Sequence, residues 1–175
     1  MGESPRLSWG MSLLDWLGIT AAGKSPEVGE LAPEAVARDD EGREVRLGHL
    51  YREGPVLVYF YPKADTPGCT AEACSLRDEF AALSERGVRV VGVSADGPSA
   101  QRRFKEKYRL PFTLLADEDK KIVEAYGVWG EKSFMGRKYL GTNRVTFLIG
   151  PDGKIRKIWP LVKPEEHAAE VLAAL

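Results

Sequence analysis

Cysteine and histidine are scarce in this sequence, which limits the kinds of site it can build. Its 175 residues contain two cysteines and two histidines. Two cysteines cannot form the disulfide network of a small secreted scaffold, and a chain of this length can bury a core without one. No Cys-x-x-Cys pair is present to begin a zinc site. The cysteines therefore indicate thiol chemistry in a reducing compartment, and we expect the cytoplasm.

Long apolar runs and an excess of either charge are also absent. Lys and Arg number 25, Asp and Glu number 26, and the formal net charge is -1. This balance argues against nucleic acid or an anionic membrane as a partner. The one basic run, QRRFKEKYR from Gln101 to Arg109, has ordinary helical spacing and indicates a solvated helix face. We expect the ligand to be a small molecule or a protein.

The first 25 residues stand apart from the rest. Their apolar stretch, SWGMSLLDWLGIT, is interrupted by Asp15 and is too short to cross a bilayer. The spacing of its large apolar side chains predicts a short amphipathic helix, packed on its own domain or on a second copy. We therefore expect an N-terminal extension over residues 1–25, one domain over residues 26–175, and a monomer or weak homodimer.

Residues 26–175 alternate between strand-like and helix-like patterns. The run PVLVYFY, from Pro55 to Tyr61, predicts a central strand buried on both faces. Further strands are expected at 88–94, after Pro111, and on both sides of the turns at 39–42 and 151–153. Helices are expected at about 69–86, 99–108, 122–126 and from Pro164. This order predicts an α/β fold with a central mixed sheet flanked by helices.

Both cysteines lie in one stretch, YPKADTPGCTAEAC, which leaves the central strand and enters a helix. A metal site would lack ligands, and a structural disulfide between Cys69 and Cys74 would close a very small loop and remove little chain entropy. The composition therefore leaves two interpretations of the cysteine pair. The cysteines are either inert core thiols or a reactive pair.

The surroundings of Cys69 favour the reactive pair. The first turn of a helix stabilises a thiolate through free amide donors and the positive end of the helix dipole. Pro67 and Gly68 allow the backbone to turn sharply into that helix, and Thr66 adds a hydroxyl nearby. These residues predict an anion-binding pocket built around a sulfur atom.

Pro62, Thr66 and Cys69 match the Pro-x-x-x-Thr-x-x-Cys signature, so the chain resembles the peroxiredoxins. The second cysteine, five residues later, is similar to that of the bacterioferritin comigratory protein, or peroxiredoxin Q, subgroup. The resemblance continues through PFTLLAD, AYGVWGEK and GRKYLGTNRVTFLIGPDGKI and covers about residues 28–175. It implies a thioredoxin-like fold and an antioxidant thiol peroxidase that needs no metal or prosthetic group.

The resemblance also implies roles for individual residues. Cys69 would be the peroxidatic cysteine and Cys74 the resolving one, while Arg144 would face the thiolate. Without the resemblance, Arg144 would be taken for an exposed arginine at a strand end. Attack on a peroxide places negative charge on the leaving oxygen, which Arg144, Thr66 and the Cys69 amide could stabilise.

Two further residues have weaker assignments. Pro62 is expected to shield the thiolate from water, although a proline also ends a strand. Glu72 is expected to orient Arg144, although an acidic residue in a first helical turn is favourable in any case. His49 and His167 have no neighbours in metal-ligand or triad spacing, and we expect both at the surface.

The expected reaction reduces hydrogen peroxide and organic hydroperoxides. The Cys69 sulfenic acid would condense with Cys74 to a disulfide, which thioredoxin or a similar dithiol would reduce. A redox sensor that passes its disulfide to a partner protein would use the same residues. A non-catalytic thioredoxin-fold binding module is a third alternative.

The cysteine spacing makes a mechanical prediction. Positions five apart on a helix point about 140° away from each other, and their α-carbons lie about 8 to 9 Å apart. An unstrained disulfide requires about 7 Å or less. The helix that carries both cysteines must therefore unwind before they can bond.

Overall fold

The most apolar run of the chain forms the central strand of the computed structural model, which describes residues 24–175. This strand, β3 (Val56–Phe60), is buried throughout, as predicted. It pairs in parallel with β4 (Arg89–Ser94) and antiparallel with β8 (Thr146–Ile149). The full sheet has the order β2-β1-β5-β4-β3-β8-β9 and is mixed, which confirms the predicted sheet type.

The outer strands also follow the sequence patterns. The turn at residues 39–42 joins β1 (Val36–Asp39) to β2 (Glu44–Arg46), and these strands are antiparallel. β5 (Thr113–Ala116) lies between β1 and β4. The turn at 151–153 joins β8 to β9 (Ile155–Trp159) in the predicted antiparallel hairpin.

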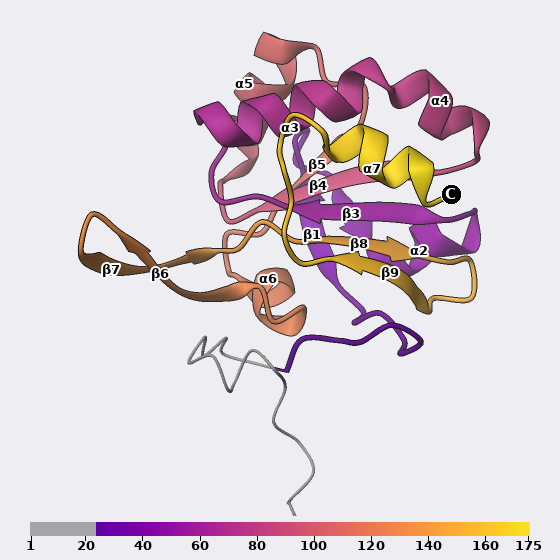
Figure 1. The fold of residues 1–175 in the computed structure, drawn as a ribbon, viewed down its shortest axis with the longest axis horizontal. Helices are drawn as coiled ribbons and strands as arrows, with labels where there is room; N and C mark the ends of the chain where they lie inside the picture. The colour runs from indigo at the N-terminus through magenta and orange to yellow at the C-terminus, as the bar shows by residue number, and fades with distance from the viewer. Residues whose placement is uncertain (1–23) are drawn as a thin grey trace, which may run out of the picture.

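Helices cover both faces of this sheet (Figure 1). One face carries α3 (Pro67–Asp78), α4 (Phe80–Glu85), α5 (Pro98–Tyr108) and α7 (His167–Ala173). The other carries α2 (Leu47–Arg52) and α6 (Lys121–Ala125). Along β3, Leu57 and Tyr59 point into the first core, while Val58 and Phe60 point into the second. This alternation explains why the strand is apolar at every position.

The prediction of a single helix at about residues 69–86 is wrong in one respect. The chain leaves helical geometry at Glu79, so α3 and α4 are separate helices. Cys69, Leu76 and Leu83 repeat every seven residues, whereas a straight α-helix drifts by about 20° per heptad. The break lets Leu83 return to the core that Cys69 and Leu76 share.

Two elements lie outside the sequence predictions. The first is the short helix α2. The second is a hairpin of β6 (Trp129–Phe134) and β7 (Arg137–Thr142), which projects from the body of the molecule (Figure 1). Most of the hairpin is exposed, so no buried face imposes an alternating pattern on its sequence. Its turn residues, Met135 and Gly136, both have positive φ, as a type I′ turn requires.

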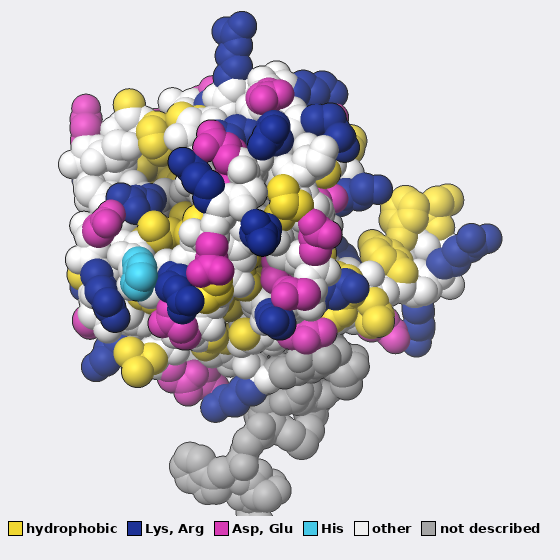
Figure 2. All heavy atoms as spheres, turned by 180° about the vertical axis from the view of Figure 1, so that it is seen from behind, with side chains coloured by type: hydrophobic (Ala, Val, Ile, Leu, Met, Phe, Trp, Pro, Cys, Tyr) yellow, Lys and Arg dark blue, Asp and Glu magenta, His cyan; other side chains and the backbone are white. Residues whose placement is uncertain are grey.

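The hairpin also carries exposed apolar side chains, beside lysine and arginine (Figure 2). They are Phe134, Met135, Tyr139 and Leu140. The predicted N-terminal extension and its amphipathic helix lie almost wholly outside the described residues. Within residues 24–175, no helix is both long enough and apolar enough to cross a bilayer.

Candidate active site

The loop from β3 to α3 is held in place by neighbouring elements. Asp65 has φ of 57°, a left-handed conformation that aspartate tolerates better than most residues. Its carboxylate accepts hydrogen bonds from Tyr108 Oη at 2.6 Å and Lys107 Nζ at 2.8 Å, both at the end of α5. The Ala64 amide donates to Asp96 Oδ2 at 2.8 Å. These contacts fix the point at which the chain enters α3.

Cys69 is the third residue of α3, and 1% of its surface is exposed. Pro67 opens the helix, a position where the missing proline N–H costs nothing. The Thr70 amide is the first to bond back along the helix, to the Thr66 carbonyl at 2.8 Å. The amides of Gly68 and Cys69 precede that bond and have no intrahelical acceptor.

Thr66 occupies the N-cap position but does not cap the helix. Its hydroxyl donates to the Lys63 carbonyl at 2.8 Å instead. An N-cap threonine ordinarily accepts a hydrogen bond from the second or third amide of its helix, here Gly68 or Cys69. Those two amides are therefore available to a ligand beside the Cys69 sulfur.

Arg144 reaches the same sulfur from the chain just before β8. Its Nη2 donates to Cys69 Sγ at 3.4 Å, and its side chain is 19% exposed. A Cβ atom at Gly68 would lie 3.0 Å from that Nη2, so glycine leaves the guanidinium its space. Partial burial opposes the charge of Arg144, but Glu72 and Cys69 outweigh it and raise the pKa of the guanidinium.

Glu72 holds the other side of the guanidinium. Its side chain is fully buried, and Oε2 accepts from Arg144 Nη1 at 2.5 Å. Glu72 is the sixth residue of α3 and lies beyond the first turn, so the suggested interaction with the helix dipole is wrong. Burial raises the pKa of Glu72 to about 7, against the opposing effect of Arg144. The buried position of Glu72 is thus explained by its ion pair with Arg144.

Pro62 and Cys74 are the two remaining residues with a predicted role in this site. Both are half-buried. Cys74 lies on α3, as Cys69 does, and both thiols are free. The structure thus brings Cys69, Arg144 and Glu72 into contact, with Thr66 at the helix start. The shielding role of Pro62 and the resolving role of Cys74 stay predictions.

The expectation that His167 lies at the surface is wrong, whereas His49 is exposed as expected. The His167 side chain is fully buried, 2.8 Å from Thr146 Oγ1 through Nε2 and 4.0 Å from Glu72 Oε1. It shares a face of α7 with the buried Val171, one helical turn later. That spacing is the sequence signal that could have placed it in the interior.

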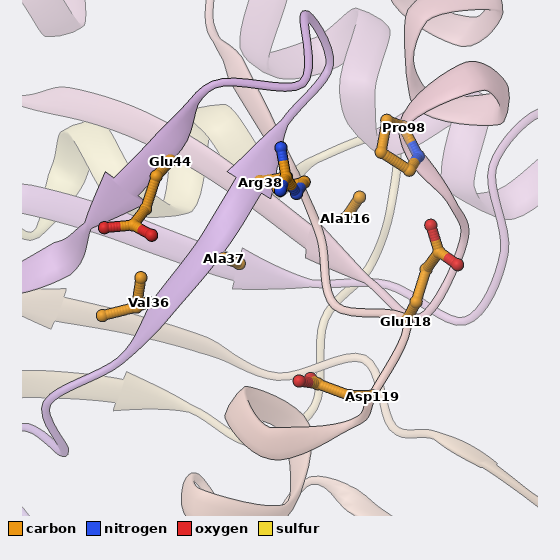
Figure 3. Close-up of a pocket in the computed structure, with 8 residues that line it drawn as sticks. All are labelled: Val36, Ala37, Arg38, Glu44, Pro98, Ala116, Glu118 and Asp119. Atoms are coloured by element: carbon orange, nitrogen blue, oxygen red, sulfur yellow. The ribbon is translucent and has the colours of Figure 1, made fainter.

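A hollow of about 300 Å³ lies elsewhere, at the edge of the sheet formed by β1 and β2 (Figure 3). Arg38, Glu44, Glu118 and Asp119 contribute its charges. It contains no thiol and none of the residues around Cys69, so we assign it no role. Residues 24–175 contain no group of three or more His, Cys, Asp or Glu side chains suited to a metal ion.

Comparison with known proteins identifies the family of the chain. Residues 28–158 match the model of the AhpC/TSA family. A putative peroxiredoxin bcp from Coxiella burnetii is 49% identical over 151 residues, which cover 86% of this chain and 99% of that protein. Peroxiredoxin Bcp from Escherichia coli K12 is 49% identical over 83% of this chain and 93% of its own.

Solved structures give the same assignment. Peroxidoxin BcpB from Mycobacterium tuberculosis superposes with a TM-score of 0.74 at 33% identity, over 83% of this chain and 94% of its own. A mutant of PrxQ from Xylella fastidiosa gives a TM-score of 0.80 at 29% identity, over 87% and 96%. The thioredoxin-like fold is thereby confirmed. The chain belongs to the AhpC/TSA family, in its branch of Bcp and PrxQ peroxiredoxins, which are thiol-dependent peroxidases.

Proposed function

We propose that this peroxidase acts through the Cys69 thiolate, with Cys74 as the resolving thiol. The observation that carries the proposal is the position of the Cys69 sulfur, at the uncapped start of α3 and 3.4 Å from the Arg144 guanidinium. A buried sulfur surrounded by amide and guanidinium donors is suited to hold negative charge and to meet a substrate that develops it.

In the first step, the Cys69 sulfur attacks the protonated oxygen of a hydroperoxide. A sulfur–oxygen bond forms, the oxygen–oxygen bond breaks, and the leaving oxygen takes a proton to become water or an alcohol. Arg144 and the free amides stabilise the charge on that oxygen in the transition state. The Thr66 hydroxyl, whose own proton points to Lys63, can accept a hydrogen bond from the hydroperoxide and orient it.

In the second step, the Cys74 thiolate attacks the sulfur of the Cys69 sulfenic acid. The new disulfide forms as the hydroxyl leaves with a proton as water. An external dithiol then reduces the disulfide and is itself oxidised. We infer thioredoxin as that dithiol from the resemblance to the Bcp and PrxQ peroxiredoxins.

The substrate range and setting complete the proposal. One structural neighbour, the bacterioferritin comigratory protein of Xanthomonas campestris, has alkyl peroxide reduction activity. By analogy we infer that the present protein takes alkyl hydroperoxides as well as hydrogen peroxide. We infer the cytoplasm, because a cysteine pair used for chemistry must be returned to its thiol form, which a reducing compartment favours. We infer a monomer or weak homodimer.

Two variants test these assignments. Cys69→Ser should abolish peroxide consumption, because serine provides no thiolate at working pH. Cys74→Ser should consume the first equivalent of peroxide but accumulate sulfenic acid, which a dimedone-type reagent traps. Peroxide turnover by Cys69→Ser would show that another group is the nucleophile. A Cys74→Ser variant that forms no dimedone adduct would remove the resolving role.

A further inference from the structure

One carboxylate oxygen in the site has no hydrogen bond among the described residues. Glu72 Oε2 is bound to Arg144, but Oε1 is buried and without a partner there. Oε1 lies 4.0 Å from His167 Nε2. A carboxylate that is held through one oxygen alone can still rotate about that contact. The imidazole of His167 lies on the side of Oε1, the oxygen that has no hydrogen bond.

His167 is itself held firmly. Nε2 lies 2.8 Å from Thr146 Oγ1 on β8, and the ring meets Trp159 edge-on, with centroids 5.9 Å apart. The next residue, Ala168, donates its amide to Ser75 Oγ on α3 at 3.2 Å. The imidazole is therefore fixed relative to both α3 and β8, the element that Arg144 precedes.

A carboxylate lies 4.0 Å from each ring nitrogen, so the hydrogen-bond partners, and not the charges, decide the tautomer. Glu72 on α3 faces Nε2, Glu170 on α7 lies 4.0 Å from Nδ1, and Arg144 is close enough to act on the ring. A proton on Nε2 can be donated to Thr146 Oγ1 and points positive charge toward Glu72. It leaves Nδ1 as an unpaired acceptor, which costs less than an unpaired buried N–H. Burial, with Arg144, lowers the pKa of His167 to about 4, so the ring stays neutral.

We propose that His167 is a positioning residue of the peroxidase site: it fixes the buried Glu72 carboxylate in the orientation that holds Arg144 on the Cys69 sulfur. The neutral ring orients Glu72 without competing with Arg144 for its charge. The C-terminal helix α7 thus takes part in organising a site whose nucleophile lies almost a hundred residues earlier. The inference rests on the proposed role of Arg144.

The test is a double-mutant cycle on the rate at which reduced protein reacts with hydrogen peroxide, measured by stopped flow. His167→Leu fills the site without a donor and should slow the reaction about tenfold through displacement of Arg144. His167→Gln, which can place an amide donor near Nε2, should retain most of the rate. In an Arg144→Gln background, His167→Leu should have no further effect. Glu170→Gln, on the Nδ1 side, is the matched control.

The outcomes separate this inference from the proposed function. If Arg144→Gln does not slow the reaction, the role of Arg144 is wrong. If Arg144→Gln slows the reaction but His167→Leu does not, the inference is overturned. It is also overturned if His167→Leu slows the reaction equally with and without Arg144→Gln, because His167 is then structural only. Imidazole ¹⁵N shifts of the wild-type protein give a check that needs no variant to fold. A proton on Nδ1 in place of Nε2 would also overturn it.

Discussion

At the residue scale, the site depends on how closely side chains approach one another, and Gly68 shows this most clearly. Alanine there would place its Cβ 3.0 Å from Arg144 Nη2, in a guanidinium that Glu72 also holds. We expect Gly68→Ala to slow the reaction with peroxide about tenfold by shifting Arg144. Alanine favours a helix over glycine, so the unfolding temperature should not fall. An unchanged rate would mean that the guanidinium has more freedom than the structure shows.

Glu72 gives the second prediction at this scale, on stability against pH. Its pKa is raised from 4.5 to about 7 by burial, so the folded protein keeps a proton that the unfolded chain releases between these values. The stabilising contribution is fully present below about pH 4.5 and is lost as pH rises through 7. Relative to Glu72→Gln, the wild type should lose about 3 kcal/mol of unfolding free energy between pH 4.5 and 8.

Urea unfolding of both reduced proteins across this range measures that loss. His167, whose folded pKa is lowered to about 4, acts in the opposite direction, since its contribution is lost as pH falls below 6.5. It is present in both proteins and largely cancels from their difference. A difference that does not change with pH would show that Glu72 is ionised throughout.

At the scale of elements, α3 has an uncapped start and an end that is anchored to two other helices. Its first turn is uncapped, whereas Ser75 accepts from the α7 amide of Ala168, and Arg77 Nη1 donates to the Tyr108 carbonyl on α5 at 2.8 Å. A Cys69–Cys74 disulfide does not fit an intact helix, so the turns that hold the two cysteines must unwind. Both cysteines lie before Ser75, so the anchored end of α3 can stay helical. The resulting opening would also expose the disulfide to its reductant.

Hydrogen exchange followed by mass spectrometry tests this unwinding of α3. Oxidation should lower amide protection over residues 66–74 and leave it largely unchanged at 76–78, and dithiothreitol should reverse the effect. Full protection across 66–74 in protein with a confirmed Cys69–Cys74 bond would contradict the unwinding. Loss of protection throughout α3 would show that the two anchors do not limit it.

The elements also differ in how well they can be predicted from the sequence alone. A strand buried on both faces, such as β3, is recognised as a short apolar run rich in β-branched and aromatic residues. The local segment from Pro62 to Cys74 carries its own motif. The β6–β7 hairpin has little buried surface to pattern it. Arg144 is found only through family resemblance, because it acts through contacts with residues distant in the chain. The spacing of His167 from Val171 could have placed it in the interior, but its contacts with Thr146 and Glu72 could not be predicted. Such contacts depend on packing that local spacing does not encode.

At the scale of the whole molecule, turnover distinguishes the peroxidase from a redox relay. With thioredoxin, its reductase and NADPH, we expect each protein molecule to consume many equivalents of peroxide, because the disulfide is reset after every cycle. Consumption of NADPH against time measures this directly, with Cys69→Ser as the control. A single equivalent, followed by a stable mixed disulfide with another protein, would identify a relay instead.

Whether Cys69 and Cys74 form the redox pair is decided by the intact mass of the reduced protein before and after one equivalent of hydrogen peroxide. We expect a monomer that has lost two hydrogen atoms, with peptide mapping that joins Cys69 to Cys74. A stable gain of oxygen at Cys69 with Cys74 still free, or a disulfide that links two chains, would show that the pair does not react in this way.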